Sequence, residues 1–188
     1  MFKITKLNNK EYLIAGSRLT LRKLKISDIS KEYLDWMNDK KTQEYTRRRG
    51  KKMTMAELKK FIHDSERSKD WHFAIITNKE NKHIGNIFLA LVDDLNKSAD
   101  LTIMVGDKDE WGKGYGSEAI ELLTEFAFKK LKLHRLSAAS PNPSFNALIK
   151  KIGWMFEGAR REAFKFKGNF VDLSCWSILK GKYLNQAK

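Results

Sequence analysis

Three glycines in five positions, Gly112, Gly114 and Gly116, come directly before an apolar pattern of helical spacing in the segment EWGKGYGSEAIELL. Glycine permits positive φ angles and lets a ligand approach the backbone closely. We expect a helix to begin near Gly116 or Ser117, where its first amide groups lack partners and the positive end of its dipole is exposed. This combination favours a bound anion, most naturally a phosphate group. The alternative is a tight surface turn that binds nothing.

The two common nucleotide-binding motifs do not fit this turn. A Walker loop has the pattern GxxxxGK[ST], but Gly106 precedes Gly112 by one residue too many, and Gly114 replaces the hydroxyl residue after Lys113. The dinucleotide fingerprint GxGxxG follows the first strand of a βαβ unit. This chain instead has GxGxG past its middle. A phosphate at this turn therefore belongs to another class of ligand.

Histidine and cysteine form no metal-binding or nucleophilic pattern. The histidines lack HxxxH or HExxH spacing, so we expect structural or surface roles for them and no metal site. Cys175 is the only cysteine and lies beside Trp176 in a strand pattern, which predicts a core thiol without a base to activate it. A single cysteine cannot form an internal disulfide, which fits a reducing cytoplasm. The four histidines are His63, His72, His83 and His134.

The composition is that of a soluble globular protein with an excess of positive charge. The chain has 188 residues, of which 41% are hydrophobic and 32% charged, and this length predicts one domain. The apolar run IFLALV is far shorter than the roughly 20 residues of a membrane span, and MFKITKLNNK lacks a signal core, so we expect a cytoplasmic location. The net charge of +14 attracts nucleic acid, phosphorylated molecules or acidic surfaces. The alternative is a lysine-rich, solvated surface.

Hydrophobic periodicity predicts the element order β-α-α-β-β-β-α-β-α-β-β in a single α/β or α+β domain. We expect Ser27 to cap the first helix, Thr54 and Glu57 to form a capping box on the second, and Gly153 to end the last. The predicted strands are 18–24, 72–77, 83–92, 99–106, 134–140, 155–166 and 170–179.

Three segments in the correct order resemble GNAT-family N-acetyltransferases. The segment VGDKDEWGKGYGSEAIELLTEFAF resembles their acyl-CoA motif [QR]xxGx[GA], with Trp111 at the Gln/Arg position, a departure familiar in the branch of ribosomal-protein N-terminal acetyltransferases. NPSFNALIKKIGW resembles the family's later helix, and FEGARREAFKFKGNFVDLSCWSIL resembles that branch's closing hairpin. The resemblance covers about residues 17–183 of a single domain, 1–188. It implies a mixed, mostly antiparallel sheet of about six to seven strands, about four helices and a splayed strand pair.

The resemblance also implies acetyl-CoA as cofactor. The pantetheine arm is then expected along the backbone of Met104, Val105 and Gly106, and Asn142 is expected to contact the cofactor. The pyrophosphate is expected on Lys113, Gly114, Tyr115, Gly116 and Ser117, with Trp111 and Gly112 as further cofactor-binding positions.

Acetyl transfer to an amine requires that a proton leave the amine. Asp100 matches the position where many relatives carry a Glu base, and its alternative is a solvated carboxylate at a strand end. The tyrosine that usually serves as acid is replaced by Ile149. Ser144 is the nearest hydroxyl, with a helix N-cap as its alternative role. A proton relay through water competes with both side chains.

The basic run TRRRGKK lies between the first two helices, where the resemblance implies the acceptor site. Arg47, Arg48 and Arg49 are candidates to hold a phosphate or carboxylate, or they form a solvated loop. Trp36 and Asn38, just before this run, resemble segments of acetyltransferases that act on nucleotide-linked amino sugars. We expect direct attack by a primary amine, either a protein N-terminus of ribosomal type or a small anionic amine.

Several partners remain open or disfavoured at this stage. A chain of charge +14 repels polyamines, so we expect these to be poor acceptors. We expect neither DNA nor membrane as a partner, and either a monomer or a homodimer. The alternative function is a non-catalytic CoA-binding or RNA-binding module, which only the net charge supports.

Overall fold

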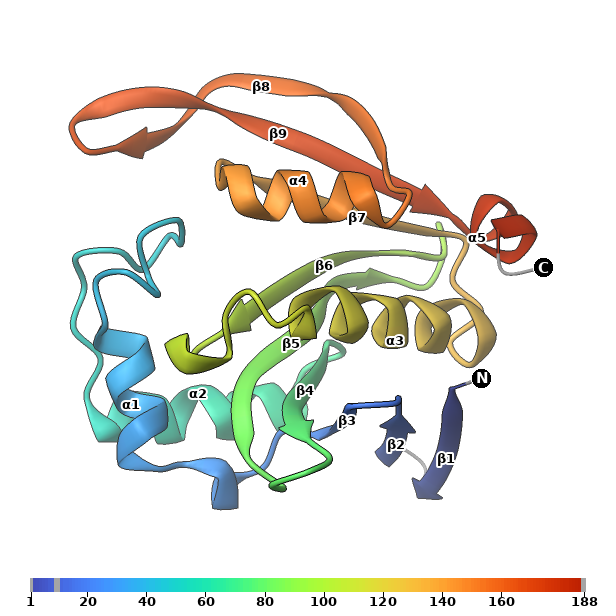
Figure 1. The fold of residues 1–188 in the computed structure, drawn as a ribbon, viewed down its shortest axis with the longest axis horizontal. Helices are drawn as coiled ribbons and strands as arrows, with labels where there is room; N and C mark the ends of the chain where they lie inside the picture. The colour runs from blue at the N-terminus through green and yellow to red at the C-terminus, as the bar shows by residue number, and fades with distance from the viewer. Residues whose placement is uncertain (1, 9–10, 187–188) are drawn as a thin grey trace.

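The computed structural model describes residues 2–8 and 11–186, which fold around one mixed sheet (Figure 1). The strand order is β1-β2-β3-β4-β5-β6-β7-β9-β8. All neighbouring strands are antiparallel except β6 and β7, which are parallel. The strands are β1 (Lys3–Asn8), β2 (Glu11–Ala15), β3 (Leu19–Lys23), β4 (Trp71–Thr77), β5 (His83–Asp93), β6 (Ser98–Val105), β7 (Arg135–Ser140), β8 (Met155–Phe166) and β9 (Asn169–Leu179).

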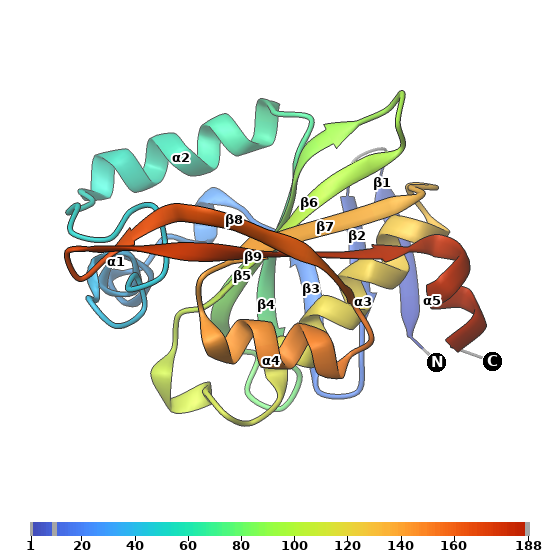
Figure 2. The same ribbon diagram turned by 90° about the horizontal axis from the view of Figure 1, so that it is seen from above.

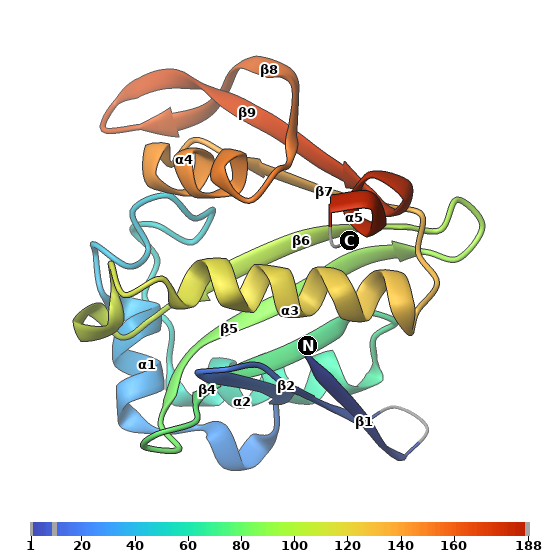
Figure 3. The same cartoon turned by 45° about the vertical axis from the view of Figure 1, so that its right-hand side comes forward.

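The helices cover both faces of the sheet, as Figures 2 and 3 show. α1 and α2 pack on one face around Tyr33, Leu58 and Ile62, and α3 packs on the other around Phe126. The helices are α1 (Lys31–Asn38), α2 (Met55–Arg67), α3 (Tyr115–Lys129), α4 (Pro143–Lys151) and α5 (Lys180–Gln186), with short 3-10 turns η1 (Ile26–Asp28) and η2 (Lys108–Glu110). The predicted GNAT-type α/β fold is confirmed.

The number of strands and one helix cap were predicted wrongly. Over residues 2–8 and 11–186 the sheet has nine strands instead of six to seven, because the N-terminal strands β1 and β2 were missed. β1 is a mostly exposed edge strand, so its sequence carries little apolar alternation. Ser27 lies within η1, and Ser30 caps α1 by accepting a hydrogen bond from Tyr33 N at 3.1 Å.

Other local predictions hold. Thr54 and Glu57 form the predicted capping box on α2. Gly153 follows α4 with a φ of 85°, as expected for a helix C-terminus. α5 extends the chain beyond the predicted order, which ended with β9. Local signals therefore predicted the start of α2 and the end of α4, whereas the cap of α1 and both terminal segments were missed.

β6 and β7 separate soon after they meet. Their pairing is limited to Ser98 with Arg135, Ala99 with Leu136 and Asp100 with Ser137. Beyond Asp100 the strands diverge and leave a wedge between them, which Figure 1 shows below α4. This is the splayed strand pair that the resemblance implied.

Candidate active site

The glycine turn has the geometry of an anion-binding helix N-terminus. Gly112 and Gly114 have φ angles of 75° and 82°. Gly114 is the N-cap of α3, which begins at Tyr115, slightly earlier than predicted. The amide groups of the first helical turn have no acceptor within the helix, and they lie at its positive end. The backbone of this turn, rather than any side chain, therefore offers the donors that a phosphate group would need.

The edge of β6 that faces the wedge directs backbone groups away from β5. Gly106 N donates to Ile84 O at 2.8 Å, and the register stays constant back to the pair of Ala90 with Asp100. Hydrogen-bonded pairs alternate in an antiparallel ladder. The even residues of β6 therefore bond to β5, and the odd residues Ile103 and Val105 direct their N–H and C=O groups into the wedge.

This register refines the expected contacts of a pantetheine arm. Of the three residues expected along the arm, Val105 alone directs its backbone into the wedge. Met104 and Gly106 turn theirs toward β5, and Ile103 is the other residue here whose backbone groups point into the wedge. The sequence could not show this, because the alternation depends on how β5 and β6 are aligned.

Trp111 links the glycine turn to the end of β6. Its indole Nε1 donates to Val105 O at 2.8 Å. Its ring is 37% exposed, and Lys41 Nζ lies 5.6 Å from the ring centroid. Lys113 bonds to Glu110 at 2.9 Å. Trp111 therefore joins the two halves of the expected cofactor site.

Asp100 lies at the vertex of the wedge, on the face of the sheet that α1 and α2 cover. Its neighbours in the strand, Ala99 and Leu101, are buried on the α3 side, so Asp100 points the opposite way. The pairing of Asp100 with Ser137 is the last before the strands diverge. The predicted base therefore lies where a thioester in the wedge would meet an acceptor from the α1–α2 face.

A polar cluster that the sequence did not predict stands next to Asp100. Arg135 donates two hydrogen bonds to Glu157, at 2.7 and 2.5 Å, and Ser177 Oγ donates to the same carboxylate at 2.8 Å. The bonds from Arg135, outweighing burial, lower the pKa of Glu157 to about 2. The pKa of Arg135 is raised, first by Glu157 and to a smaller extent by the charge of Asp100. Asp100 therefore lies in the field of a guanidinium.

The residues expected at the start of α4 bond mainly to one another. Asn142 is the N-cap of α4, and its Oδ1 accepts from Ser144 N at 2.9 Å. The capping role considered for Ser144 thus belongs to Asn142. Ser144 is exposed, and Ile149 is fully buried. An exposed hydroxyl is open to water, which keeps the water relay as the alternative to Ser144.

Trp36 and Asn38 are both engaged within the protein. Asn38 Nδ2 donates to Met53 O at 2.9 Å, and its Oδ1 accepts from Met53 N at 2.7 Å. The Trp36 ring lies flat against Gly106, where a Cβ atom would be 2.3 Å from Cδ2. Its position sets how closely α1 approaches the end of β6, so Trp36 shapes the site even without touching an acceptor.

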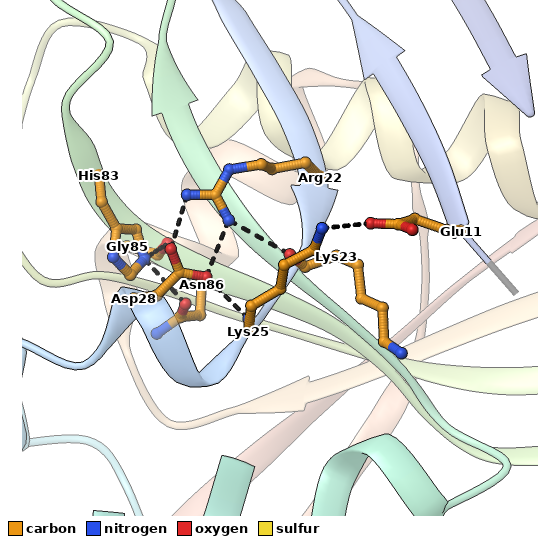
Figure 4. Close-up of polar contacts among 8 residues, drawn as sticks. All are labelled: Glu11, Arg22, Lys23, Lys25, Asp28, His83, Gly85 and Asn86. Atoms are coloured by element: carbon orange, nitrogen blue, oxygen red, sulfur yellow. Dashed lines mark hydrogen bonds and ion pairs between the residues drawn. The ribbon is translucent and has the colours of Figure 1, made fainter. Parts of the chain in front are cut away.

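A polar network anchors the segment before α1 (Figure 4). Arg22 donates two hydrogen bonds to Asp28, at 2.8 and 2.6 Å. His83 Nε2 lies 2.9 Å from Gly85 O and 3.0 Å from Asn86 Oδ1, and burial lowers the pKa of His83. The bonds from Arg22 hold η1 against β3. The His83 ring also packs edge-to-face against Tyr33 and Trp36, at centroid distances of 5.5 and 5.3 Å, and these contacts place α1 against the start of β5.

The loop between α1 and α2 is fastened to the tip of the β8–β9 hairpin, which Figure 2 shows beside it. Arg49 Cζ lies 3.8 Å from the Phe164 ring centroid, and its Nη2 donates to Lys165 O. Tyr45 stacks on Phe166 with centroids 5.0 Å apart. We call these contacts the clasp; its members are Glu44, Tyr45, Arg49, Phe164, Lys165, Phe166 and Lys167, the last bonded to Glu44 at 3.1 Å.

The three arginines of the basic run therefore differ. Arg49 holds the clasp, and Arg47 is exposed. Arg48 Nε is buried and has no hydrogen-bond partner in residues 2–8 and 11–186. A buried donor without an acceptor is costly unless a ligand satisfies it. Arg48 is therefore the member of the run best suited to hold an acceptor.

Two further features are absent from residues 2–8 and 11–186, a metal site and a membrane-spanning helix. No group of three or more His, Cys, Asp or Glu side chains there could hold a metal ion. No described helix is long and apolar enough to cross a membrane.

A profile of the acetyltransferase (GNAT) domain family matches residues 18–155. The chain belongs to the GNAT acetyltransferase family. This GNAT protein is 29% identical over 171 residues to an uncharacterized N-acetyltransferase, p20, of Bacillus licheniformis, covering 88% of this chain and 95% of the relative. It is therefore an N-acetyltransferase with acetyl-CoA as the acetyl donor.

Two further relatives show the breadth of the family. The GNAT chain is 32% identical over 101 residues to YdaF of Bacillus subtilis, a protein named for ribosomal N-acetyltransferase activity, covering 53% of this chain and 55% of the relative. It shares its fold with the spermidine N-acetyltransferase of Vibrio cholerae, solved with CoA and spermine, at a TM-score of 0.81 and 24% identity over 90% of this chain and all of that one.

Proposed function

We propose that this GNAT acetyltransferase acetylates a primary amine on an acceptor that also carries an anionic group, such as a nucleotide-linked amino sugar. The buried, unpartnered Nε of Arg48 carries this proposal. Burial of an unsatisfied charged donor is unfavourable, and a carboxylate or phosphate is the partner that a guanidinium binds best. A polyamine offers no such partner.

The residues present fit the cofactor. Acetyl-CoA, when bound, supplies the thioester whose acetyl group passes to the amine. The glycine turn leaves its backbone open to a pyrophosphate, since Gly112 and Gly114 adopt positive φ angles that other residues adopt only with strain. Ile103 and the N–H of Val105 offer backbone groups to an amide-bearing arm along the wedge, whereas Val105 O already accepts from Trp111 Nε1.

Proton transfer from the amine is proposed at the vertex of the wedge, where Asp100 lies. In our proposal Asp100 accepts the proton that the amine loses on attack, directly or through a water molecule. The backbone N–H groups along the edge of β6 are donors for negative charge that develops in the wedge. Ser144 or a water molecule donates a proton to the CoA thiolate as it leaves. The chain needs no covalent intermediate for this sequence of steps.

A protein N-terminus of ribosomal type is the second candidate acceptor. It is favoured by the similarity to YdaF of Bacillus subtilis, whose printed name refers to ribosomal acetylation. A polyamine is the acceptor named for the Vibrio cholerae enzyme, but the charge of +14 opposes it here.

A thiol-release assay at fixed acetyl-CoA concentration tests these alternatives. Three acceptors are compared: a nucleotide-linked amino sugar, a peptide with a free α-amine and spermidine. We expect the nucleotide-linked amino sugar to react fastest. Faster turnover of spermidine or of the peptide would overturn the proposal.

A variant pair then tests the role of Arg48. Arg48→Gln should raise the acceptor KM about tenfold, since one charge-assisted hydrogen bond contributes about 1.5–3 kcal/mol. The KM for acetyl-CoA should stay unchanged. Arg47→Gln removes the same charge from the exposed neighbouring position and is the matched control. Equal effects of the two variants would indicate loss of general attraction, not of a specific contact.

A further inference from the structure

A buried carboxylate in the first turn of α3 is held by the segment that leads into β3. Glu118 is 6% exposed and accepts hydrogen bonds from Ser17 Oγ at 3.1 Å, Arg18 N at 2.8 Å and Arg18 Nε at 2.9 Å. Burial raises the pKa of Glu118, but these bonds outweigh it and hold the pKa below its usual range. Gly16 leaves room for the carboxylate, because a Cβ there would lie 2.6 Å from Oε1. Glu118 thus fixes the Arg18 guanidinium in one orientation.

The far edge of the same guanidinium reaches the glycine turn. Arg18 Nη1 donates to Lys113 O at 2.7 Å. A Cβ built on Gly114 would lie 3.3 Å from Nη2, and Arg18 Cζ lies 5.0 Å from the Tyr115 ring centroid. Arg18 therefore contacts three successive residues of the turn, from a position 95 residues earlier in the chain.

The contact with the Lys113 carbonyl determines where the next amide points. The C=O of Lys113 and the N–H of Gly114 belong to one planar trans peptide unit, so they point in opposite directions. Because the Lys113 carbonyl points toward Arg18, the Gly114 N–H points away from Arg18, to the open side of the turn. Without that hydrogen bond, Gly114, which follows this peptide unit, allows the unit to rotate.

We propose that Arg18 is a positioning residue for the donor: by holding the Lys113 carbonyl, it orients the Gly114 N–H that binds the pyrophosphate of acetyl-CoA. The proposal rests on the assignment of the glycine turn to that pyrophosphate. It adds a residue from outside the glycine motif, supplied by the segment before β3. Glu118 supports it from the first turn of α3.

Arg18→Lys isolates the contact. A lysine keeps the positive charge beside Glu118, but its single ammonium cannot bond to Glu118 and to Lys113 O in the fork geometry of a guanidinium. Calorimetry with CoA and with pantetheine, which lacks the phosphates, is the measurement. We expect the Kd for CoA to rise about tenfold, the loss of one charge-assisted hydrogen bond, and the Kd for pantetheine to stay unchanged.

Arg22→Lys is the matched control. Arg22 lies on β3, four residues after Arg18, and also donates two hydrogen bonds to a carboxylate, that of Asp28. In the part of the chain that the structure describes, Arg22 does not contact the glycine turn. Thermal unfolding of both variants measures the damage to the fold. The control should leave the Kd for both ligands unchanged, whatever its unfolding temperature.

Gly114→Val separates failure of this proposal from failure of the turn assignment, because a β-branched residue is strained at a φ of 82°. Weaker CoA binding in both Gly114→Val and Arg18→Lys, with pantetheine spared, supports the role of Arg18. Weaker binding in Gly114→Val alone overturns it. Unchanged CoA binding in both overturns the turn assignment, and the proposal falls with it. Equal weakening of CoA and pantetheine in Arg18→Lys shows general damage and also overturns the proposal.

Discussion

Breaking the clasp should release the β8–β9 hairpin from the α1–α2 loop. Phe164 is only 8% exposed although it lies on a protruding hairpin, so the loop must cover it. A cation–π contact is worth about 0.5–2 kcal/mol, and a stacked aromatic pair contributes about 0.5–1.5 kcal/mol beyond its buried area. The Tyr45→Ala, Arg49→Ala double variant removes both, together with the hydrogen bond to Lys165 O. We estimate a loss of roughly 2–3 kcal/mol.

This loss should increase the open population of the hairpin by roughly 30- to 150-fold. Hydrogen exchange of the peptide spanning residues 155–179 measures it, and the acceptor KM should rise while that for acetyl-CoA stays constant. Phe170→Ala is the control, because Phe170 is 62% exposed on the same hairpin and lies outside the clasp. Unchanged exchange in the double variant would show that strand pairing alone holds the hairpin, and would refute the clasp.

Three further variants test the vertex and the end of β6. Gly106→Ala should destabilise the chain by about 1–3 kcal/mol in urea unfolding, because the new Cβ would lie 2.3 Å from the Trp36 ring. When Trp36→Ala is added, the two losses of stability should sum to less than their separate values. Strict additivity would exclude that contact as the cause. Asp100→Asn should lower turnover at neutral pH and recover at high pH, where more amine is neutral, whereas wild-type rates at every pH would remove Asp100 from the mechanism. Glu157 has a pKa of about 2 when folded against 4.5 for a free side chain, so its contribution to stability is complete above pH 4.5 and is lost as the pH falls toward 2. Glu157→Gln should therefore flatten the dependence of unfolding free energy on pH in that window, and an unchanged slope would contradict the assignment.

The donor side of the site was largely predictable from the sequence, because its signals are local. The glycines of the turn and the apolar pattern of α3 are adjacent in the chain, and both the positive φ angles and the helix start follow from residue types. The capping box of Thr54 and Glu57 is local in the same sense. The register between β5 and β6 could not be predicted from the sequence. The backbone groups of Ile103 face the wedge only because of how these two strands are aligned.

The missed residues act over long separations in the sequence. Arg18 lies 95 residues before Lys113, and Arg49 lies 116 residues before Lys165. Nothing in the basic run TRRRGKK shows that Arg49 is used within the fold while Arg48 is left with a buried free donor. A motif reports residue types, whereas these roles depend on which side chains the tertiary structure has already paired.

This difference explains why the donor can be named and the acceptor only proposed. In our proposal, backbone groups at the glycine turn and the wedge bind the donor, and these groups persist while side chains change around them. Side chains from the α1–α2 loop and the closing hairpin are proposed for the acceptor side, and most of them are engaged with one another. Acceptor choice then rests on a few unpaired groups, such as Arg48 Nε. A chain 24% identical to this one can thus keep the fold and be named for spermidine, while a segment 32% identical belongs to a protein named for ribosomal acetylation.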